Sequence, residues 1–153
     1  MKVDFLSPVP PSYAQDIASL FGQAWWTRDR TAIEAAEICR DSHTVTAGIR
    51  EGDDGSRLVA FCRLLTDGRH KAMLMDVIVE ESLRGSGLAL RLLEHALALP
   101  RVRAVEDVEL YCSPDLVPFY ASLGFSVPES TTFMRRSQAV VPPPSPLKGE
   151  GPW

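Results

Sequence analysis

A glycine-rich stretch in the middle of the chain combines residue types that bind anions. It runs Asp76-Val-Ile-Val-Glu-Glu-Ser-Leu-Arg84-Gly-Ser-Gly-Leu-Ala89, an apolar strand that leads through a loop directly into a helix. Glycines let a backbone approach a ligand closely, and the first N–H groups of a helix lack intrahelical partners and carry partial positive charge. The loop therefore predicts a cradle for a phosphate or pyrophosphate, with the fixed charge of Arg84 at its rim.

Two common nucleotide-binding patterns do not match this loop. A P-loop requires a lysine followed by serine or threonine after its last glycine, and Leu88 follows Gly87 here. A dinucleotide-binding fingerprint requires a third glycine at the start of a parallel βαβ unit. That glycine is missing, and short Asp-Gly turns predict antiparallel hairpins before the loop. A nucleotide-binding domain is therefore the weaker interpretation.

The elements around the loop are predicted from periodicity, caps and turns. Two capping boxes, Ser12 with Gln15 and Thr31 with Glu34, mark the starts of two helices. A first strand precedes these two helices, the second of which ends at about Arg40, and three antiparallel strands follow (45–49, 58–65 and 72–79). Next come a helix (88–99) stopped by Pro100 and a strand (108–112). The last helix is opened by Ser113-Pro114-Asp115, with Asp115 as its cap and Gly124 at its end, and a final strand (132–136) follows it.

Composition limits the class of protein. The 153 residues carry 16 Lys+Arg and 20 Asp+Glu, a net charge of −4, and 45% are hydrophobic, as in a soluble globular domain. The mild acidity disfavours a nucleic-acid partner, and no apolar run approaches the ~20 residues of a membrane span. Asp4 interrupts the apolar stretch that a signal peptide needs, so we expect a cytoplasmic protein. Cys39, Cys62 and Cys112 are odd in number and widely spaced, which predicts reduced thiols and no metal site.

Prolines locate the end of the folded part. Five of the twelve follow Ala139, in a stretch that can form neither a helix nor a strand ladder. We therefore expect one domain over residues 1–138 and a disordered or loosely docked proline-rich tail over residues 139–153.

Two motifs together resemble the GNAT superfamily of N-acetyltransferases. Arg84-Gly85-Ser86-Gly87-Leu88-Ala89 fits that family's Arg/Gln-x-x-Gly-x-Gly/Ala signature, and Val77-Ile78-Val79 looks like its fourth strand. About 30 residues later, Tyr120 to Phe125 fits the family's second motif, Tyr-x-x-x-Gly-Phe. The element order matches over residues 1–136. Three further segments show a weaker resemblance, to small bacterial members of the family: Trp25-Trp26 with Arg30, Thr66-Asp67, and Pro128-Glu129 with Phe133-Met134.

The resemblance implies a mixed α/β (α+β) fold and a cofactor-binding mode. The central, mostly antiparallel sheet would splay between its fourth and fifth strands, with helices on both sides and acetyl-CoA in the gap. The backbone of Val77, Ile78 and Val79 would pair with the pantetheine arm, although a buried core strand has the same sequence character. The N–H groups of the loop would hold the pyrophosphate: Arg84, Gly85, Ser86, Gly87, Leu88 and Ala89. Where the family often has a cofactor-contacting Asn, this chain has Ser113, which weakens that contact.

The resemblance also implies roles in catalysis. Tyr120 matches the general acid that protonates the departing thiolate, although its other interpretation is a core aromatic residue. The N–H of Val77 is our candidate oxyanion donor. For the base, we favour Asp76, as base or as an amine-orienting group, because a carboxylate in an apolar strand needs a task or a partner. Asp67 either caps its turn or contacts substrate, and His70 is expected on the surface.

The acceptor pocket is expected near the first two helices, their connection and the loop before the last strand. Trp25, Trp26, Arg63 and Asp67 are the candidate substrate-binding residues, and these types suit an acceptor with an apolar or carboxylate portion. Adjacent tryptophans cannot share one helix face, so we expect one in the core and one exposed. Arg28 and Arg30 are expected to be solvated. The leading hypothesis is acetyl transfer to a primary amine of a small molecule. A non-catalytic acyl-CoA-binding module, a peptide or protein acceptor, and a homodimer remain open.

Overall fold

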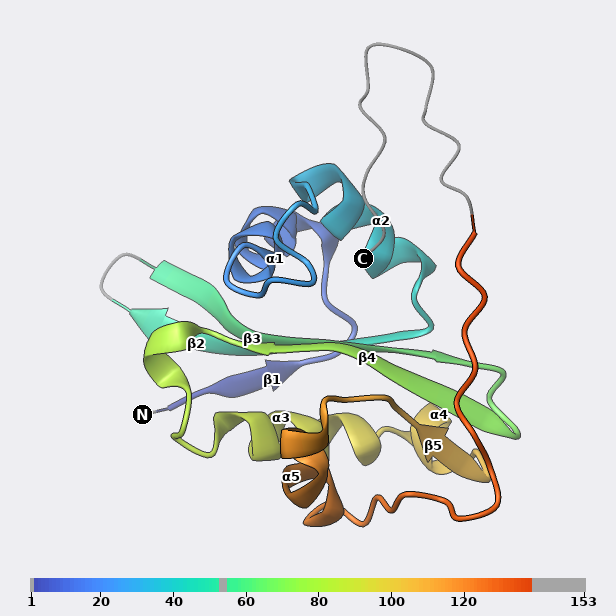
Figure 1. Cartoon of the computed structure of the whole chain (residues 1–153). Coiled ribbons are helices and arrows are strands. Elements are labelled where there is room, and N and C mark those ends of the chain that lie inside the picture. The colour runs from blue at the N-terminus through green and yellow to red at the C-terminus, as the bar shows by residue number, and fades with distance from the viewer. Residues whose placement is uncertain (1, 53–54, 139–153) are drawn as a thin grey trace. The chain divides into compact units, whose positions relative to one another are not determined.

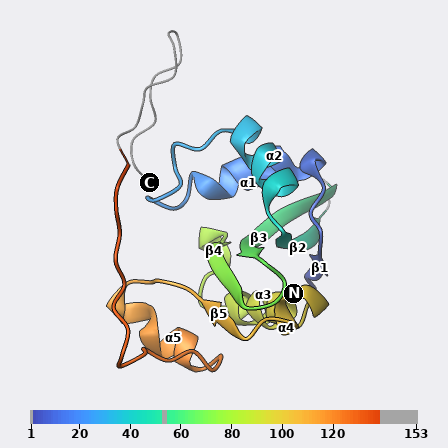
Figure 2. The same ribbon diagram turned by 90° about the vertical axis from the view of Figure 1, so that its right-hand side faces the viewer.

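The computed structural model describes residues 2–52 and 55–138, in two compact units, Met1–Cys112 and Ser113–Trp153. In the first unit, helices lie on both sides of one sheet, with α1 and α2 on one side and α3 and α4 on the other (Figure 1, Figure 2). Its elements are β1 Asp4–Leu6, a 3-10 turn Pro11–Tyr13, α1 Ala14–Phe21, α2 Ala32–Asp41, β2 Thr44–Gly52, β3 Gly55–Thr66, β4 Lys71–Val79, a 3-10 turn Glu81–Leu83, α3 Leu88–Leu97, α4 Pro100–Arg103 and β5 Asp107–Glu109.

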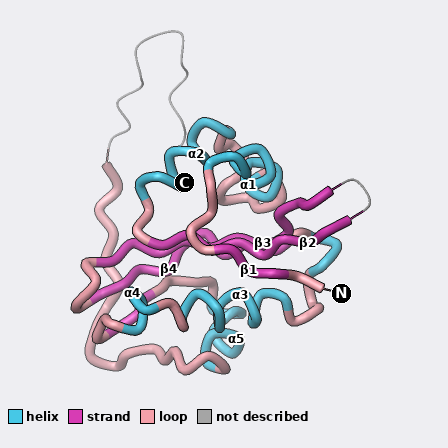
Figure 3. Tube along the Cα trace, turned by 180° about the vertical axis from the view of Figure 1, so that it is seen from behind, coloured by secondary structure: helices cyan, strands magenta, loops and turns pink. Residues whose placement is uncertain are grey.

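The sheet has the order β1-β2-β3-β4-β5, which follows the chain. The first three pairings are antiparallel, as the short turns between the strands require, and β4 pairs with β5 in parallel. A parallel pair needs a crossover connection, and α3 with α4 provides it on the face opposite α1 and α2 (Figure 3). The mixed sheet that the sequence predicts is therefore confirmed.

One face of the sheet packs on α1. Ile17 and Phe21 of α1 are fully buried, and the Phe21 ring meets the Phe61 ring of β3 edge-on, with centroids 5.6 Å apart. Ile78 of β4, paired with Phe61, belongs to the same buried cluster. Side chains alternate along a strand, so the face of the sheet that packs on α1 also carries four further side chains of β3 and β4: Arg63, Leu65, Met73 and Met75. None of these four is fully buried, so α1 and α2 cover only part of this face.

Local sequence patterns predict some helix ends correctly and others wrongly. The capping box at the start of α2 is confirmed: Thr31 accepts a hydrogen bond from the Glu34 N–H, and the Glu34 carboxylate accepts one from the Thr31 N–H. The predicted box at Ser12 and Gln15 is wrong, because Pro11–Tyr13 forms a 3-10 turn and α1 begins after Tyr13 without a side-chain cap. Pro100 does not merely stop α3. It occupies the first turn of α4, where its missing N–H costs little.

The second unit holds a short helix. A 3-10 turn over Pro114–Leu116 leads into α5, Val117–Ala121, so Asp115 lies inside the turn and does not cap the helix. Gly124 has a φ of 91°, the left-handed conformation expected after a helix end. The predicted strand over 132–136 is wrong, since these residues have no strand pairing in the described structure. The predicted boundary at 138/139 adjoins residues outside the described ones and stays a prediction.

Candidate functional site

Strand β4 loses one of its two neighbouring strands after its third residue. Only its first three residues pair with β5, Lys71–Met73 with Asp107–Glu109. Further on, Ile78 and Val79 pair with Phe61 and Ala60 of β3, and within the described residues no strand lies on their other side. The edge of β4 at residues 77–79 is therefore open to an extended ligand that pairs with it as an added strand.

A bulge precedes this open edge. The β3–β4 register shifts between Phe61 and Arg63, which leaves Asp76 and Val77 without Cα partners on β3. Asp76 has a φ of 53°, and it is the one non-glycine residue with positive φ among the described residues. Aspartate tolerates this left-handed conformation better than most residues. The bulge thus turns the strand immediately before the residues predicted to bind the cofactor.

The loop after β4 has the backbone of an anion cradle. Gly85 and Gly87 have φ values of 75° and 82°, which favour glycine, and no atom lies within 4 Å of where a Cβ would stand on either. Gly87 is the N-cap of α3 and no side chain caps this helix, so its first N–H groups are available to a ligand. The Ser86 hydroxyl donates to the Leu83 carbonyl at 2.6 Å. The cradle therefore fits a pyrophosphate.

The side chain of Arg84 ties the cradle to the rest of the unit. Its Nε donates to the Val79 carbonyl at 3.1 Å, and its Nη2 donates to the Gln23 carbonyl at 3.2 Å. The Gln23 side chain in turn accepts from the Glu81 N–H at 2.8 Å. The α1–α2 loop is thus fastened to the loop that follows β4. The sequence held no signal for Gln23, since its role depends on a contact 58 residues away.

Asp76 lies between two arginines. Its Oδ2 accepts from Arg30 Nη1 at 2.7 Å and from Arg63 Nε at 2.6 Å. The Asp76 side chain is 7% exposed, and those of Arg30 and Arg63 are 16% and 17% exposed. The expectation that Arg30 is solvated is therefore wrong, because its guanidinium pairs with the buried carboxylate and lies over the Phe21 ring, 5.1 Å from the centroid.

Asp67 has a different environment. Its Oδ1 accepts from the N–H groups of Arg69, His70 and Lys71 at 2.8–3.1 Å, which closes the β3–β4 turn. These hydrogen bonds hold the pKa of Asp67 well below its usual range. Of the two interpretations that the sequence allowed, turn capping accounts for these contacts. His70 is exposed, as expected, and its Nδ1 lies 3.2 Å from Asp67 Oδ2.

Both tryptophans lie in the α1–α2 loop and neither belongs to the core. Trp25 is 76% exposed and Trp26 is 39% exposed, and their rings meet edge-on with centroids 5.7 Å apart. The expectation of one core tryptophan is wrong because the helix ends at Phe21, before both residues. The buried Thr27 fixes the loop instead, and its hydroxyl donates to the Phe21 carbonyl at 2.9 Å.

Tyr120 and Ser113 belong to the second unit. The Tyr120 ring meets Phe119 and Phe125 edge-on, with centroids 5.0 and 5.9 Å apart. Ser113 precedes the 3-10 turn, and its hydroxyl does not cap it. Their predicted roles toward the cofactor stay predictions.

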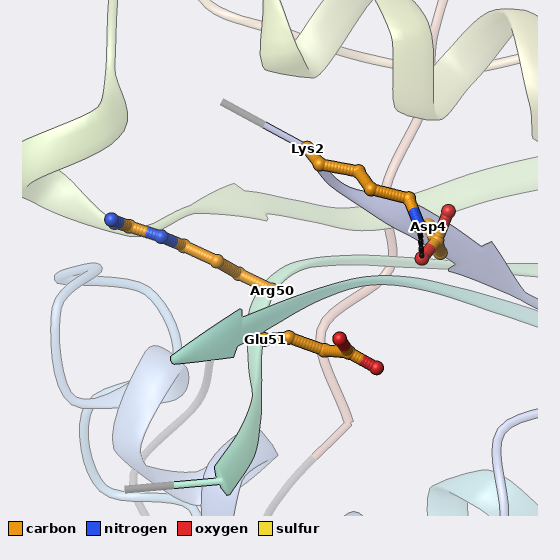
Figure 4. Close-up of a pocket in the computed structure, with 4 residues that line it drawn as sticks. All are labelled: Lys2, Asp4, Arg50 and Glu51. Atoms are coloured by element: carbon orange, nitrogen blue, oxygen red, sulfur yellow. Dashed lines mark ion pairs between the residues drawn. The ribbon is translucent and has the colours of Figure 1, made fainter. Parts of the chain in front are cut away.

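Two surface depressions lie elsewhere in the first unit. One depression, of about 530 Å³, lies at the start of β4 and includes Asp67, Lys71 and Met73 in its lining. Another, of about 350 Å³, is lined by Lys2, Asp4, Arg50 and Glu51, with Lys2 Nζ 3.7 Å from Asp4 (Figure 4).

Cys62 is buried in β3, and burial raises the pKa of its thiol to about 12. In the described part of the chain no helix is long and apolar enough to span a membrane.

Known proteins resemble this chain in sequence and fold. Residues 12–125 match the model of the acetyltransferase (GNAT) family. Serotonin N-acetyltransferase 2, chloroplastic, of Oryza sativa subsp. japonica is 37% identical over 102 residues, which are 65% of this chain and 47% of that protein. A crystal structure of an acetyltransferase assigned to the GNAT family from Xanthomonas campestris superposes with a TM-score of 0.72 at 24% identity, over 90% of this chain and 94% of that one.

A further structure contains a coenzyme A moiety. AAC(6')-Iy, in complex with a bisubstrate analogue of coenzyme A and acetylneamine, superposes with a TM-score of 0.68 at 17% identity, over 90% of this chain and all of that one. At this identity the likeness shows the fold alone. The chain spans about half the length of most of the curated relatives that it matches.

Proposed function

The chain belongs to the acetyltransferase (GNAT) family, and on that premise we propose that it is an N-acetyltransferase that acts on the primary amine of a small molecule. One observation carries the proposal: the open edge of β4 at residues 77–79 runs straight into a glycine loop and an uncapped helix start. Such an edge suits an amide-containing arm, and such a loop suits a pyrophosphate. Coenzyme A has both groups in this order.

The cofactor contacts would be made by main-chain atoms. The side chains of Ile78, Val79 and Leu88 are buried in the core, so these residues would serve the ligand through their backbone. Residues 85–89 would offer N–H groups to the pyrophosphate, whereas the N–H of Arg84 already donates to the Glu81 carbonyl at 3.3 Å. The thioester of acetyl-CoA supplies an acyl group that an amine can attack.

Catalysis would need a donor for the developing oxyanion and a proton for the leaving sulfur. The Val77 N–H, just after the bulge, is our candidate oxyanion donor. Attack forms a nitrogen–carbon bond and breaks the carbon–sulfur bond. Tyr120 would donate the proton that the sulfur takes, and water would accept the proton that the nitrogen loses. Of the two roles left open for Asp76, its contacts favour orientation over proton abstraction, since Oδ2 is engaged by two arginines.

A thermal-shift titration tests the binding step. We expect acetyl-CoA and free CoA, but not ATP, to raise the melting temperature, because a ligand at one hundred times its Kd stabilises the folded state by about 2.7 kcal/mol. Thiol release with a panel of amines then tests turnover. Binding without thiol release for any amine would favour a non-catalytic acyl-CoA-binding module. The absence of a shift with either CoA species would contradict the proposal.

The Tyr120→Phe variant tests the acid role. We expect kcat to fall by about 10²- to 10⁴-fold, the usual contribution of a positioned acid. The acetyl-CoA-induced thermal shift should stay unchanged, because the substitution removes one hydroxyl. Phe119→Leu, at the neighbouring position, is the control for altered packing. Unchanged turnover in Tyr120→Phe would assign the proton to another group.

A further inference from the structure

The arginines beside the bulge carry more positive charge than their shared partner neutralises. Arg30 and Arg63 both donate to Oδ2 of Asp76, and no second carboxylate of the described residues lies within ion-pair distance of either. The group therefore carries a net charge of +1. We call Arg30, Arg63 and Asp76 the arginine clamp. Water screens an excess charge less where it is partly buried, so this excess attracts an anionic ligand.

The clamp also has unused hydrogen-bond donors. A guanidinium offers five N–H groups. Arg30 uses Nη1 for Asp76, whereas Arg63 uses Nε for Asp76 and Nη1 for the Ser42 hydroxyl at 3.5 Å. Among the described residues no buried side-chain nitrogen or oxygen lacks a partner. The remaining guanidinium nitrogens must therefore lie where solvent or a ligand can reach them.

The clamp is next to the place where the chemistry is proposed to occur. Asp76 directly precedes Val77, our candidate oxyanion donor, and Arg63 pairs in register with Met75 on the part of the sheet face that α1 and α2 leave uncovered. A group bound by the clamp would therefore lie near the candidate oxyanion donor. In an α-amino acid, the carboxylate carbon is two bonds from the amine nitrogen. This short spacing fits the clamp better than a distant anionic group would.

The loop that supplies Arg30 also presents an aromatic surface. Trp25 and Trp26 precede Arg30 by five and four residues and are exposed, in a loop that Thr27 and the clamp hold in place. Aromatic side chains stack on aromatic ligands. An aromatic amino acid is therefore the best first probe.

We propose that Arg63 and Arg30, oriented by Asp76, bind the carboxylate of an α-amino acid acceptor. The inference rests on the proposed function and names its substrate class. Bidentate contacts between guanidinium and carboxylate groups are specific as well as strong. Asp76 is a positioning residue in this account, and the two arginines determine specificity.

The test compares amines that differ only in the carboxylate. L-Phenylalanine and 2-phenylethylamine form one pair, and L-tryptophan and tryptamine form another. We expect kcat/KM for thiol release to be about tenfold to a hundredfold higher for the amino acid of each pair, because an amine without the carboxylate leaves the guanidinium donors unpaired. Arg63→Gln should abolish most of this preference by raising KM for the amino acid far more than KM for 2-phenylethylamine. Arg63→Lys, which keeps the charge and loses the planar fork, should give an intermediate preference.

Two controls separate the possible failures. Arg50→Gln removes an arginine from β2, at the depression in Figure 4, and should keep the full preference. A normal acetyl-CoA-induced thermal shift in each variant shows that it folds. Two results together would support the clamp site and contradict the proposed function. The first is calorimetric binding of L-phenylalanine, but not of 2-phenylethylamine, in the presence of CoA. The second is the absence of thiol release from acetyl-CoA with either amine. Thiol release with equal or better use of 2-phenylethylamine, or a preference that survives Arg63→Gln, would overturn the inference.

Discussion

At its first residues β4 lies between two strands, and at its last residues it lies beside one. Lys71 pairs with β5, and its ammonium bonds to both Asp107 and Glu109, whereas residues 77–79 have no strand on that side in the described structure. An aspartate stands near each end. Asp67 is exposed and caps a turn, while Asp76 is buried, has positive φ and is held by two arginines.

This contrast shows how one strand can serve both stability and function. The closed end satisfies its own hydrogen bonds through β5 and through the Asp67 turn. The open end has no strand on that side in the described structure, and the Val79 carbonyl there accepts from the Arg84 side chain instead. The bulge, the arginine clamp and the Arg84 contacts with Val79 and Gln23 hold the strand and loop in place without a fifth-strand neighbour.

Asp76→Ala gives the largest expected effect on stability. It removes the shared partner of two partly buried arginines, and loss of one member of a buried ion pair costs about 3 kcal/mol or more. Alanine is also less favourable than aspartate at positive φ. We expect a fall of that size in the free energy of unfolding, measured by urea denaturation. Asp76→Asn keeps a residue type that tolerates positive φ, so its smaller loss would isolate the contribution of charge.

Asp67→Ala, the same substitution near the first residues of β4, is the matched control for Asp76→Ala. Asp67→Ala removes an exposed turn cap and should lower stability much less than Asp76→Ala. Equal losses in the free energy of unfolding at the two positions would contradict the distinction drawn between the two ends of β4.

Gly87→Ala should have an intermediate effect. No atom obstructs the new methyl group, so the cost comes from the φ of 82° and amounts to about 1–2 kcal/mol. Because the substitution strains the cradle, the acetyl-CoA-induced thermal shift should also become smaller. Gly22→Ala is the control, since Gly22 has a φ of −63° and the new Cβ would make ordinary contacts. A CoA response that is normal in Gly87→Ala would show that the cradle does not bind the cofactor.

Asp67→Asn should have the smallest effect, visible in the pH dependence of stability. The pKa of Asp67 is lower in the folded state than the unfolded value of about 3.9. Its ionisation therefore stabilises the fold above that unfolded value, and the stabilisation is lost as pH falls through the lower folded pKa. The melting temperatures of wild type and variant should differ slightly at neutral pH and converge in acid. A difference that grows in acid would contradict the capping role.

Local signals in the sequence were sufficient for much of the fold. The Asp67-Gly68 turn and the alternating strands predicted the antiparallel hairpins, and Thr31 with Glu34 predicted the start of α2. The glycines at 85 and 87 predicted a loop that opens directly onto α3, and both have positive φ in the structure. These features depend on residues only a few positions apart.

Features that depend on distant contacts were missed. The position of Arg30 depends on Asp76, 46 residues away, and no local pattern records that pairing. The sequence marked Asp76 as a carboxylate in an apolar strand that needed a task or a partner, but it predicted neither the bulge nor the two arginine partners. At Ser12 the prolines before it imposed a 3-10 turn, which overrode a local capping pattern. At 132–136, strand-like residues found no pairing strand in the described structure.

Amide hydrogen exchange with and without acetyl-CoA tests the central claim most directly. The account predicts new protection at residues 77–79 and 84–89 when acetyl-CoA binds, with no change at Lys71–Met73, where β5 already pairs. Asp67 and the turn that follows should also be unaffected. Binding of acetyl-CoA that leaves residues 77–79 and 84–89 unprotected, or that protects the closed end instead, would contradict the assignment of this strand and loop as the cofactor site.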